Sequence, residues 1–226
     1  MTLAHSERPW FSNYFLYMLS GLLLILFALP YVRERVHNAL IFDLLTALIL
    51  CVGVYALSQR RLAFWVGIAL GLPTLSASIV ATLLPGHDLA LGFNYASNTV
   101  FFTYITASMV FAMMRERQVS ANTLYAGMCC YLLLAFSWAN YYACAFLIDD
   151  KVFTASQPEM LRTFSDFMYF SVVTLSTVGY GDITPVDPAV RMAAGFEAMV
   201  GQLYLTILVA RLVGLHLTQH GDLSRH

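Results

Sequence analysis

The sequence predicts an all-α membrane protein with six transmembrane helices and one re-entrant segment, and two observations carry this prediction. Of the 226 residues, 59% are hydrophobic and only 11% are charged, and the mean hydropathy is +0.69. Because a soluble domain carries roughly 25% charged residues, this chain has too few charges to cover a water-exposed surface. The second observation is that the apolar residues gather in long stretches separated by short polar breaks.

Six of these stretches have the length of a transmembrane helix, since a bilayer core takes about 20 apolar residues per crossing. They cover residues 12–30, 39–58, 62–84, 93–114, 122–147 and 189–216. The first stretch begins with aromatic residues and has no small-residue cleavage site, so we expect a membrane helix there rather than a cleaved signal peptide.

Residues 148–188 form the segment that differs from the six spans. Thr163 and Asp166 fit a capping box, which predicts a short helix over 164–175. At 1.5 Å per residue this helix is about 18 Å long, too short to cross a bilayer but long enough to dip halfway and return. Its C-terminal end carries partial negative charge and would favour a cation at mid-membrane.

The run TVGYGD, residues 177–182, follows this short helix. Gly179 and Gly181 can take backbone angles closed to residues with a Cβ, so successive carbonyl groups can point to one side. Carbonyl oxygens arranged in this way replace the hydration shell of a potassium ion. Val178 and Tyr180 would turn outward and brace the strand, and Thr177 would add its hydroxyl oxygen. The predicted K⁺-binding residues are Thr177, Val178, Gly179, Tyr180 and Gly181, with the ion held at the first four.

On these residues, positions 122–217 resemble the pore module of the potassium channel family, of the bacterial type with two helices around a filter loop. The matching run extends from Thr174 to Asp182, with Pro185 beyond it, and Gly201 stands where the family often places a glycine hinge. The resemblance implies a homotetramer, because one filter loop supplies only a quarter of a pore. Some relatives carry a carboxylate at the position of Val173, paired with the aspartate after the filter, and that pair is absent here.

Several further residues are expected to support the filter. Tyr169 and Phe170 would form an aromatic cuff beside Tyr180, and Asp182 closes the filter motif. Glu197 is an acidic residue deep in a predicted span, where a carboxylate is expensive and should have a partner. We expect it to anchor the short helix or the filter backbone; a direct ion site or a proton sensor is the alternative.

The last span carries a partly polar face that we expect to line the pore. Its residues fall at i, i+3, i+4, i+7 and i+11: Gln202, Leu205, Thr206, Val209 and Val213. The two valines are candidates for an inner constriction that gates by dewetting. The alternative is an ordinary contact between helices.

The predicted domains are a peripheral four-helix domain over 1–118, a pore domain over 119–217 and a short cytoplasmic tail over 218–226. Six spans with the filter between the last two resemble the topology of voltage-gated channels. In those channels the fourth span carries regularly spaced arginines that move in the field, whereas 93–114 contains none. We therefore expect no steep voltage dependence. With the filter loop outside, seven basic residues lie inside and five outside, which agrees with the positive-inside tendency and places both termini in the cytoplasm.

The function predicted from these features is a passive, potassium-selective channel in the cell membrane. The alternatives are a potassium-uptake or transporter subunit, and a channel whose first four helices sense a ligand or lipid. We expect no enzyme activity, no nucleic-acid partner and no cofactor besides permeant K⁺, with further copies of the chain and membrane lipid as partners. The four cysteines lack metal-binding spacing and are expected to be free thiols. The gating stimulus and any accessory subunit stay open.

Overall fold

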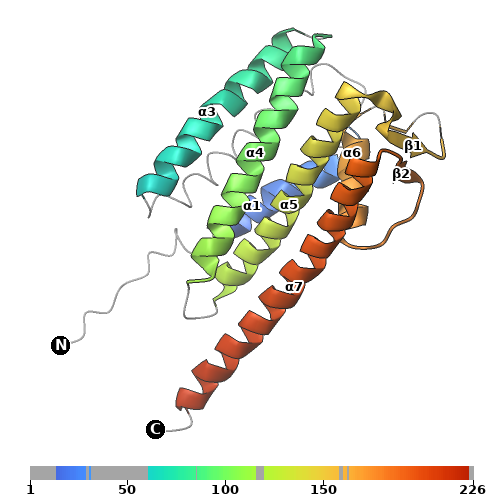
Figure 1. Ribbon diagram of the computed structural model, residues 1–226. Coiled ribbons are helices and arrows are strands. Elements are labelled where there is room, and N and C mark those ends of the chain that lie inside the picture. Colours follow the sequence, from blue (N-terminus) through green and yellow to red (C-terminus); the bar gives the residue numbers. More distant parts are fainter. Residues whose placement is uncertain are drawn as a thin grey trace.

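The computed structural model describes residues 14–28, 31, 61–84, 86–115, 120–157, 160–161 and 163–223 (Figure 1). The predicted second span, 39–58, and Cys51 lie outside these residues. The elements are α1 Tyr14–Ala28, α3 Arg61–Leu83, α4 Asp88–Met113, α5 Ala121–Ile148, a 3₁₀ turn Asp150–Val152, β1 Phe153–Ala155, α6 Phe164–Leu175, β2 Ile183–Pro185 and α7 Pro188–Leu223.

Four helices of the described part are long and apolar enough to cross a membrane: α3, α4, α5 and α7 as far as Gly214. They match four of the predicted spans to within a few residues at most ends, so the chain is a multi-pass membrane protein. The first predicted span gives a helix of only 15 residues, α1. The short helix α6 begins and ends where the sequence predicted, and the Thr163 N–H donates to Asp166 Oδ2 at 2.9 Å, as a capping box requires.

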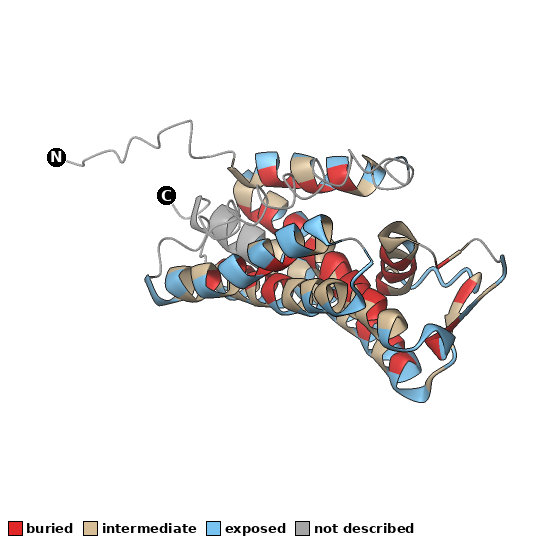
Figure 2. Cartoon of the chain, turned by 90° about the horizontal axis from the view of Figure 1, so that it is seen from above, coloured by how far each residue is buried: buried red, intermediate tan, exposed pale blue. Residues whose placement is uncertain are grey.

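The helices pack side by side around α5, with α4 along one side, α7 along another and α1 crossing behind (Figure 1). The ring of Phe102 on α4 lies 5.9 Å from that of Phe136 on α5, and the hydroxyl oxygens of Thr103 and Ser137 are 2.6 Å apart. In α3, Gly71 lies against Phe101, where a Cβ would come within 3.2 Å of the ring. Buried residues lie where helices face one another (Figure 2).

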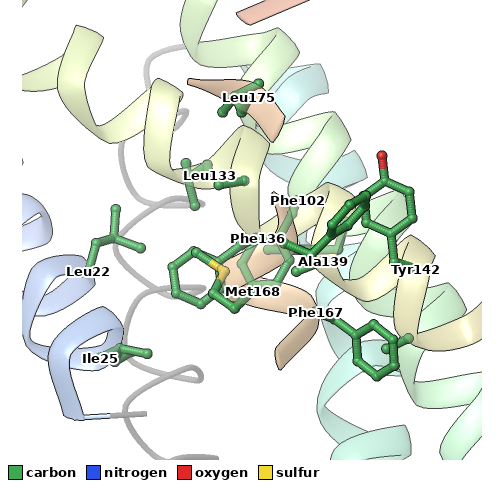
Figure 3. Close-up of a cluster of buried hydrophobic side chains, with 14 of the residues drawn as sticks. Leu22, Ile25, Phe102, Leu133, Phe136, Ala139, Tyr142, Phe167, Met168 and Leu175 are labelled. Atoms are coloured by element: carbon green, nitrogen blue, oxygen red, sulfur yellow. The ribbon is translucent and has the colours of Figure 1, made fainter. Parts of the chain in front are cut away.

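The core is formed mainly by side chains from α1, α4, α5 and α6 (Figure 3), and residues of both strands and of α7 complete it. Leu22 and Ile25 enter it from α1, and Met168 and Leu175 enter it from α6. All four are at most 2% exposed. The short helix α6 is therefore built into the same core that joins the longer helices. Cys129, Cys130 and Cys144 are free thiols, as predicted for those three.

The structure is mostly helical, as the predicted all-α class requires, and also contains a small antiparallel sheet that the sequence did not predict. Strand β1, after α5, pairs with β2, after the TVGYGD run, with Thr154 opposite Thr184. The Ser156 N–H also donates to the carbonyl oxygen of Asp182 at 2.8 Å. Strands of three residues are too short to show an alternating pattern in the sequence. The sheet ties the two ends of the segment that contains α6 and residues 177–182.

Candidate ion-conduction site

The candidate site begins at the C-terminal end of α6, where Leu175 is fully buried between α5 and α7. The Tyr131 hydroxyl of α5 donates to the carbonyl oxygen of Leu175 at 3.2 Å. Gly201 of α7 abuts the same carbonyl, because a Cβ at this glycine would overlap the carbonyl oxygen. The end of the short helix is thus held from both sides.

The last carbonyl groups of a helix lack partners inside the helix and need them elsewhere. In α6 they find them in the turn that follows: the Ser176 N–H donates to Val172, and the Val178 N–H donates to Val173, each at the carbonyl oxygen. The Thr177 N–H donates to the carbonyl oxygen of Thr174 at 2.9 Å. Together with the bond from Tyr131, these contacts fix where residues 177–182 start.

The backbone of residues 177–181 alternates in handedness. Thr177, Gly179 and Gly181 have φ values of 60°, 59° and 77°, whereas the residues between them do not have positive φ. In an extended strand, successive carbonyls point to opposite sides; reversing the handedness of every second residue brings them to one side. The two glycines take this conformation freely, but Thr177 does so at a cost of about 1 kcal/mol. The alternation therefore favours a row of carbonyl oxygens on one side of the run.

Tyr169 supports this row from α6. Its ring stacks on that of Tyr180, with centroids 6.4 Å apart and planes within 3°. Its hydroxyl donates to Asp182 Oδ2 at 2.7 Å, and the other carboxylate oxygen, Oδ1, accepts from the Ile183 N–H at 3.1 Å. Tyr169 thus contacts residues at the C-terminal end of the run through both its ring and its hydroxyl.

Within the chain, Phe170 packs against rings other than that of Tyr180, and its part in the expected cuff stays a prediction. Its ring lies 5.0 Å from that of Tyr142 and 5.2 Å from that of Phe153. Neighbouring residues of a helix point about 100° apart, so when Tyr169 faces Tyr180, Phe170 faces α5 and β1. Within one chain, Phe170 supports α6 rather than Tyr180.

Glu197 lies on α7 with no exposed surface. The Tyr142 hydroxyl of α5 donates to Oε2 at 2.6 Å, and Ser171 Oγ of α6 lies 2.5 Å from Oε1. Ser171 Oγ is also 2.9 Å from the carbonyl oxygen of Ala135 on α5. The carboxyl group therefore joins α7 to both neighbouring helices, α5 and α6.

The outward faces of α7 are uncovered in the single chain. All five residues of the predicted pore face, Gln202, Leu205, Thr206, Val209 and Val213, are exposed. The neighbouring face packs on the same chain: the Tyr204 hydroxyl donates to the carbonyl oxygen of Gly127 at 2.7 Å, and Leu208 contacts Gly127. The residues of the run itself, from Thr177 to Gly181, are also exposed, with Tyr180 at 71%. The helix thus separates a packed face from an open one.

Sequence reasoning missed Tyr131, Tyr142 and Ser171 as supports of the site. Each carries a hydroxyl group inside an apolar segment, and such a group needs a hydrogen-bond partner when buried. That requirement was visible in the sequence, but the partner was not, because it lies on another helix.

Comparison with known proteins identifies the family. A family model described as an ion channel matches residues 98–215, just over half of the 226-residue chain. The chain therefore belongs to this ion channel family. No solved structure is significantly similar to the chain.

Individual relatives also match parts of the chain. Protein LctB of Bacillus caldotenax is 30% identical over 113 residues, which cover 48% of this chain and 84% of LctB. Two pore potassium channel c of Oryza sativa subsp. japonica is 39% identical over 62 residues, covering 27% of this chain and 13% of that protein. The inward rectifier potassium channel Kirbac3.1 of Paramagnetospirillum magnetotacticum is 33% identical over 66 residues, covering 29% and 21%. The matches to these two potassium channels thus span well under two thirds of their length.

The contact at Gly201 predicts that alanine substitutions at two glycines of α7 differ strongly in their effect on stability. Gly201→Ala places a methyl group against the Leu175 carbonyl and should destabilise the protein by about 1–3 kcal/mol, as overpacking does. Gly195→Ala is the matched control, because nothing lies within 4 Å of its Cβ position. Thermal unfolding in detergent measures both. Equal midpoints for the two variants would contradict the close approach of α6 and α7.

The hydrogen bonds of Glu197 predict different results for two substitutions. Glu197→Ala leaves the hydroxyls of Tyr142 and Ser171 without this partner and should cost on the order of 1–3 kcal/mol. Glu197→Gln fills the same space, accepts from Tyr142 and can donate to Ser171, so most of the stability should remain. Thermal unfolding again measures the effect, and an alanine variant as stable as the glutamine variant would show that the hydrogen bonds do not matter.

Proposed function

We propose that the protein is the subunit of a homotetrameric, potassium-selective channel that conducts K⁺ passively across the cell membrane. The observation that carries this proposal is the alternating backbone at Thr177, Gly179 and Gly181, at the end of a short helix held between two long ones. Carbonyl oxygens on one side of such a strand match the coordination that K⁺ needs. Three relatives whose names describe potassium channels, each matching 27–30% of the chain, agree with this proposal.

We infer a tetramer because one chain supplies only part of each ion-binding site. A single strand can coordinate an ion from one side only, so four copies around an axis complete each binding site. The exposed Val178 and Tyr180 would then be covered by neighbouring copies, and the open face of α7 would line a water-filled cavity. In this arrangement Val209 and Val213 lie at the inner constriction and Gly201 permits bending of α7, besides its contact with Leu175.

The proposed subunit has six transmembrane helices, with residues 1–118 as a peripheral domain, 119–217 as the pore domain and a cytoplasmic tail from 218. Both termini are cytoplasmic and the sheet of β1 and β2 faces outside. Lipid covers the outer helices.

We propose that α4 acts as a fixed strut rather than as a voltage sensor. It contains no arginine and is attached to the pore domain at three levels. At the outer end, Tyr95 stacks on Phe164 with centroids 6.0 Å apart. In the middle, Thr103 meets Ser137. At the inner end, Arg211 Nη2 of α7 donates to the carbonyl oxygen of Met113 at 2.9 Å. A helix held in this way has neither the charge nor the freedom to move in the field.

The experiment that tests the function is recording from purified protein in planar bilayers under opposed potassium and sodium gradients, with voltage stepped in both directions. We expect the current to reverse near the potassium equilibrium potential and the open probability to change little with voltage. Reversal near zero would contradict selectivity. Flux into vesicles without unitary currents would favour the transporter alternative.

The bond between Tyr169 and Asp182 predicts a specific change in the open channel. Tyr169→Phe keeps the ring stacked on Tyr180 but removes the hydroxyl, so the outer end of the filter loses one hydrogen bond. We expect current during sustained opening to decay several-fold faster, measured in macroscopic recordings. The matched control is Tyr141→Phe, whose ring packs on Trp138 and Tyr142 away from the filter. Equal decay in both variants would show that the hydroxyl of Tyr169 does not stabilise the filter.

A further inference from the structure

The side chain of Gln202 reaches the inner end of the filter. Its Nε2 donates to Thr177 Oγ1 at 3.3 Å. The preceding residue, Gly201, abuts the carbonyl of Leu175, two residues before Thr177. Because the missing Cβ lets α7 approach α6 at this point, the next residue of α7 stands beside the threonine.

The hydrogen bond from Gln202 restricts how the hydroxyl group of Thr177 can be oriented. A threonine hydroxyl has one hydrogen to donate and two lone pairs to accept with, and its hydrogen rotates freely unless a partner fixes it. An amide N–H can only donate, so it occupies one lone pair of Thr177 Oγ1 and leaves the second for another partner. The backbone of Thr177, held in the left-handed region with φ 60°, already limits where the oxygen lies.

We propose that Gln202 is a positioning residue that sets the cation affinity of the innermost filter site, by directing the free lone pair of the Thr177 hydroxyl toward the ion path. This inference rests on the proposed function and names a determinant of specificity within it. In the tetramer the contact occurs four times around one ion, so a small change in each hydroxyl is multiplied at the site.

Neighbouring residues of α7 do not share this role. Thr206, one turn further along the same face, donates its hydroxyl to the carbonyl oxygen of Gln202 in its own helix at 2.8 Å. It is as polar and as exposed to the proposed cavity, but it is hydrogen-bonded within α7. It therefore provides a matched control for loss of polarity on this face.

The test measures block by Ba²⁺ applied from the inner side of the full-length channel. Ba²⁺ has nearly the size of K⁺ and twice its charge, so it reports the affinity of the deepest filter site. Gln202→Met keeps the length of the side chain but removes the donor, and we expect the half-blocking concentration to rise by roughly tenfold. Thr206→Val should change it less than about twofold.

A second variant keeps the inference open to refutation if the methionine variant fails to assemble, and a double-mutant cycle tests the contact itself. Gln202→Glu turns the donor into an acceptor, so the Thr177 hydroxyl donates to the carboxylate and both its lone pairs are free; block should become tighter. Combining Gln202→Met with Thr177→Val should add nothing to the effect of Thr177→Val alone, because the acceptor is already gone.

The outcomes separate this inference from the proposed function. If the wild-type channel selects potassium but Gln202→Met leaves Ba²⁺ block as in Thr206→Val, or if the two substitutions in the cycle are additive, Gln202 does not position Thr177. If the wild-type current does not reverse near the potassium potential, the proposed function itself is wrong.

Discussion

The short helix α6 cannot cross a membrane, and the position of residues 177–181 depends on how the two ends of this helix are held. Its C-terminal end is held at the Leu175 carbonyl, which accepts from Tyr131 on α5 and lies against Gly201 on α7. Its N-terminal end begins at the Thr163 capping box. In between, Ser171 meets Glu197. Non-helical backbone at membrane depth is tolerated only when it is buried in protein or lines a water-filled cavity. The contacts of α6 therefore determine where residues 177–181 can lie.

Helix α7 has two faces with different environments: one packs on the same chain and the other is exposed. One stripe, which includes Gly201, Tyr204 and Leu208, packs on the same chain, and Arg211 continues it toward the inner end of α4. The face turned about 100° away carries the exposed residues from Gln202 to Val213. A helix with this division is anchored firmly while it leaves one side for water and for other copies of the chain. In the account proposed here, the same helix therefore supports the filter and forms the cavity below it.

Local signals allowed much of the site to be predicted from the sequence. The bounds of α6 followed from its capping box and from the length of its apolar run, and the positive φ values at Gly179 and Gly181 agree with the conformational freedom of glycine. Contacts between helices were harder to predict. Glu197 needed a partner, but only the packing of three helices shows that the partners are Ser171 and Tyr142.

Other features have no local signal at all. The sheet between β1 and β2 pairs three-residue strands across the whole α6 segment. Helical periodicity alone does not determine whether Tyr169 or Phe170 faces Tyr180, so it does not predict the direction of Phe170. The left-handed φ of Thr177 is also outside what the residue type predicts, because a β-branched residue disfavours it. The sheet and the direction of Phe170 depend on contacts between segments far apart in the sequence.

In the proposed tetramer, residues 177–181 form a row of oxygens that binds dehydrated cations on a shared axis. The most direct measurement is an anomalous difference map of the full-length protein crystallised from lipid with Tl⁺ in place of K⁺. We expect four copies of the chain around one axis, with peaks on that axis level with the carbonyl oxygens of Thr177, Val178, Gly179 and Tyr180. Tl⁺ bound away from this strand, or an assembly in which the strands do not face a common axis, would contradict the account.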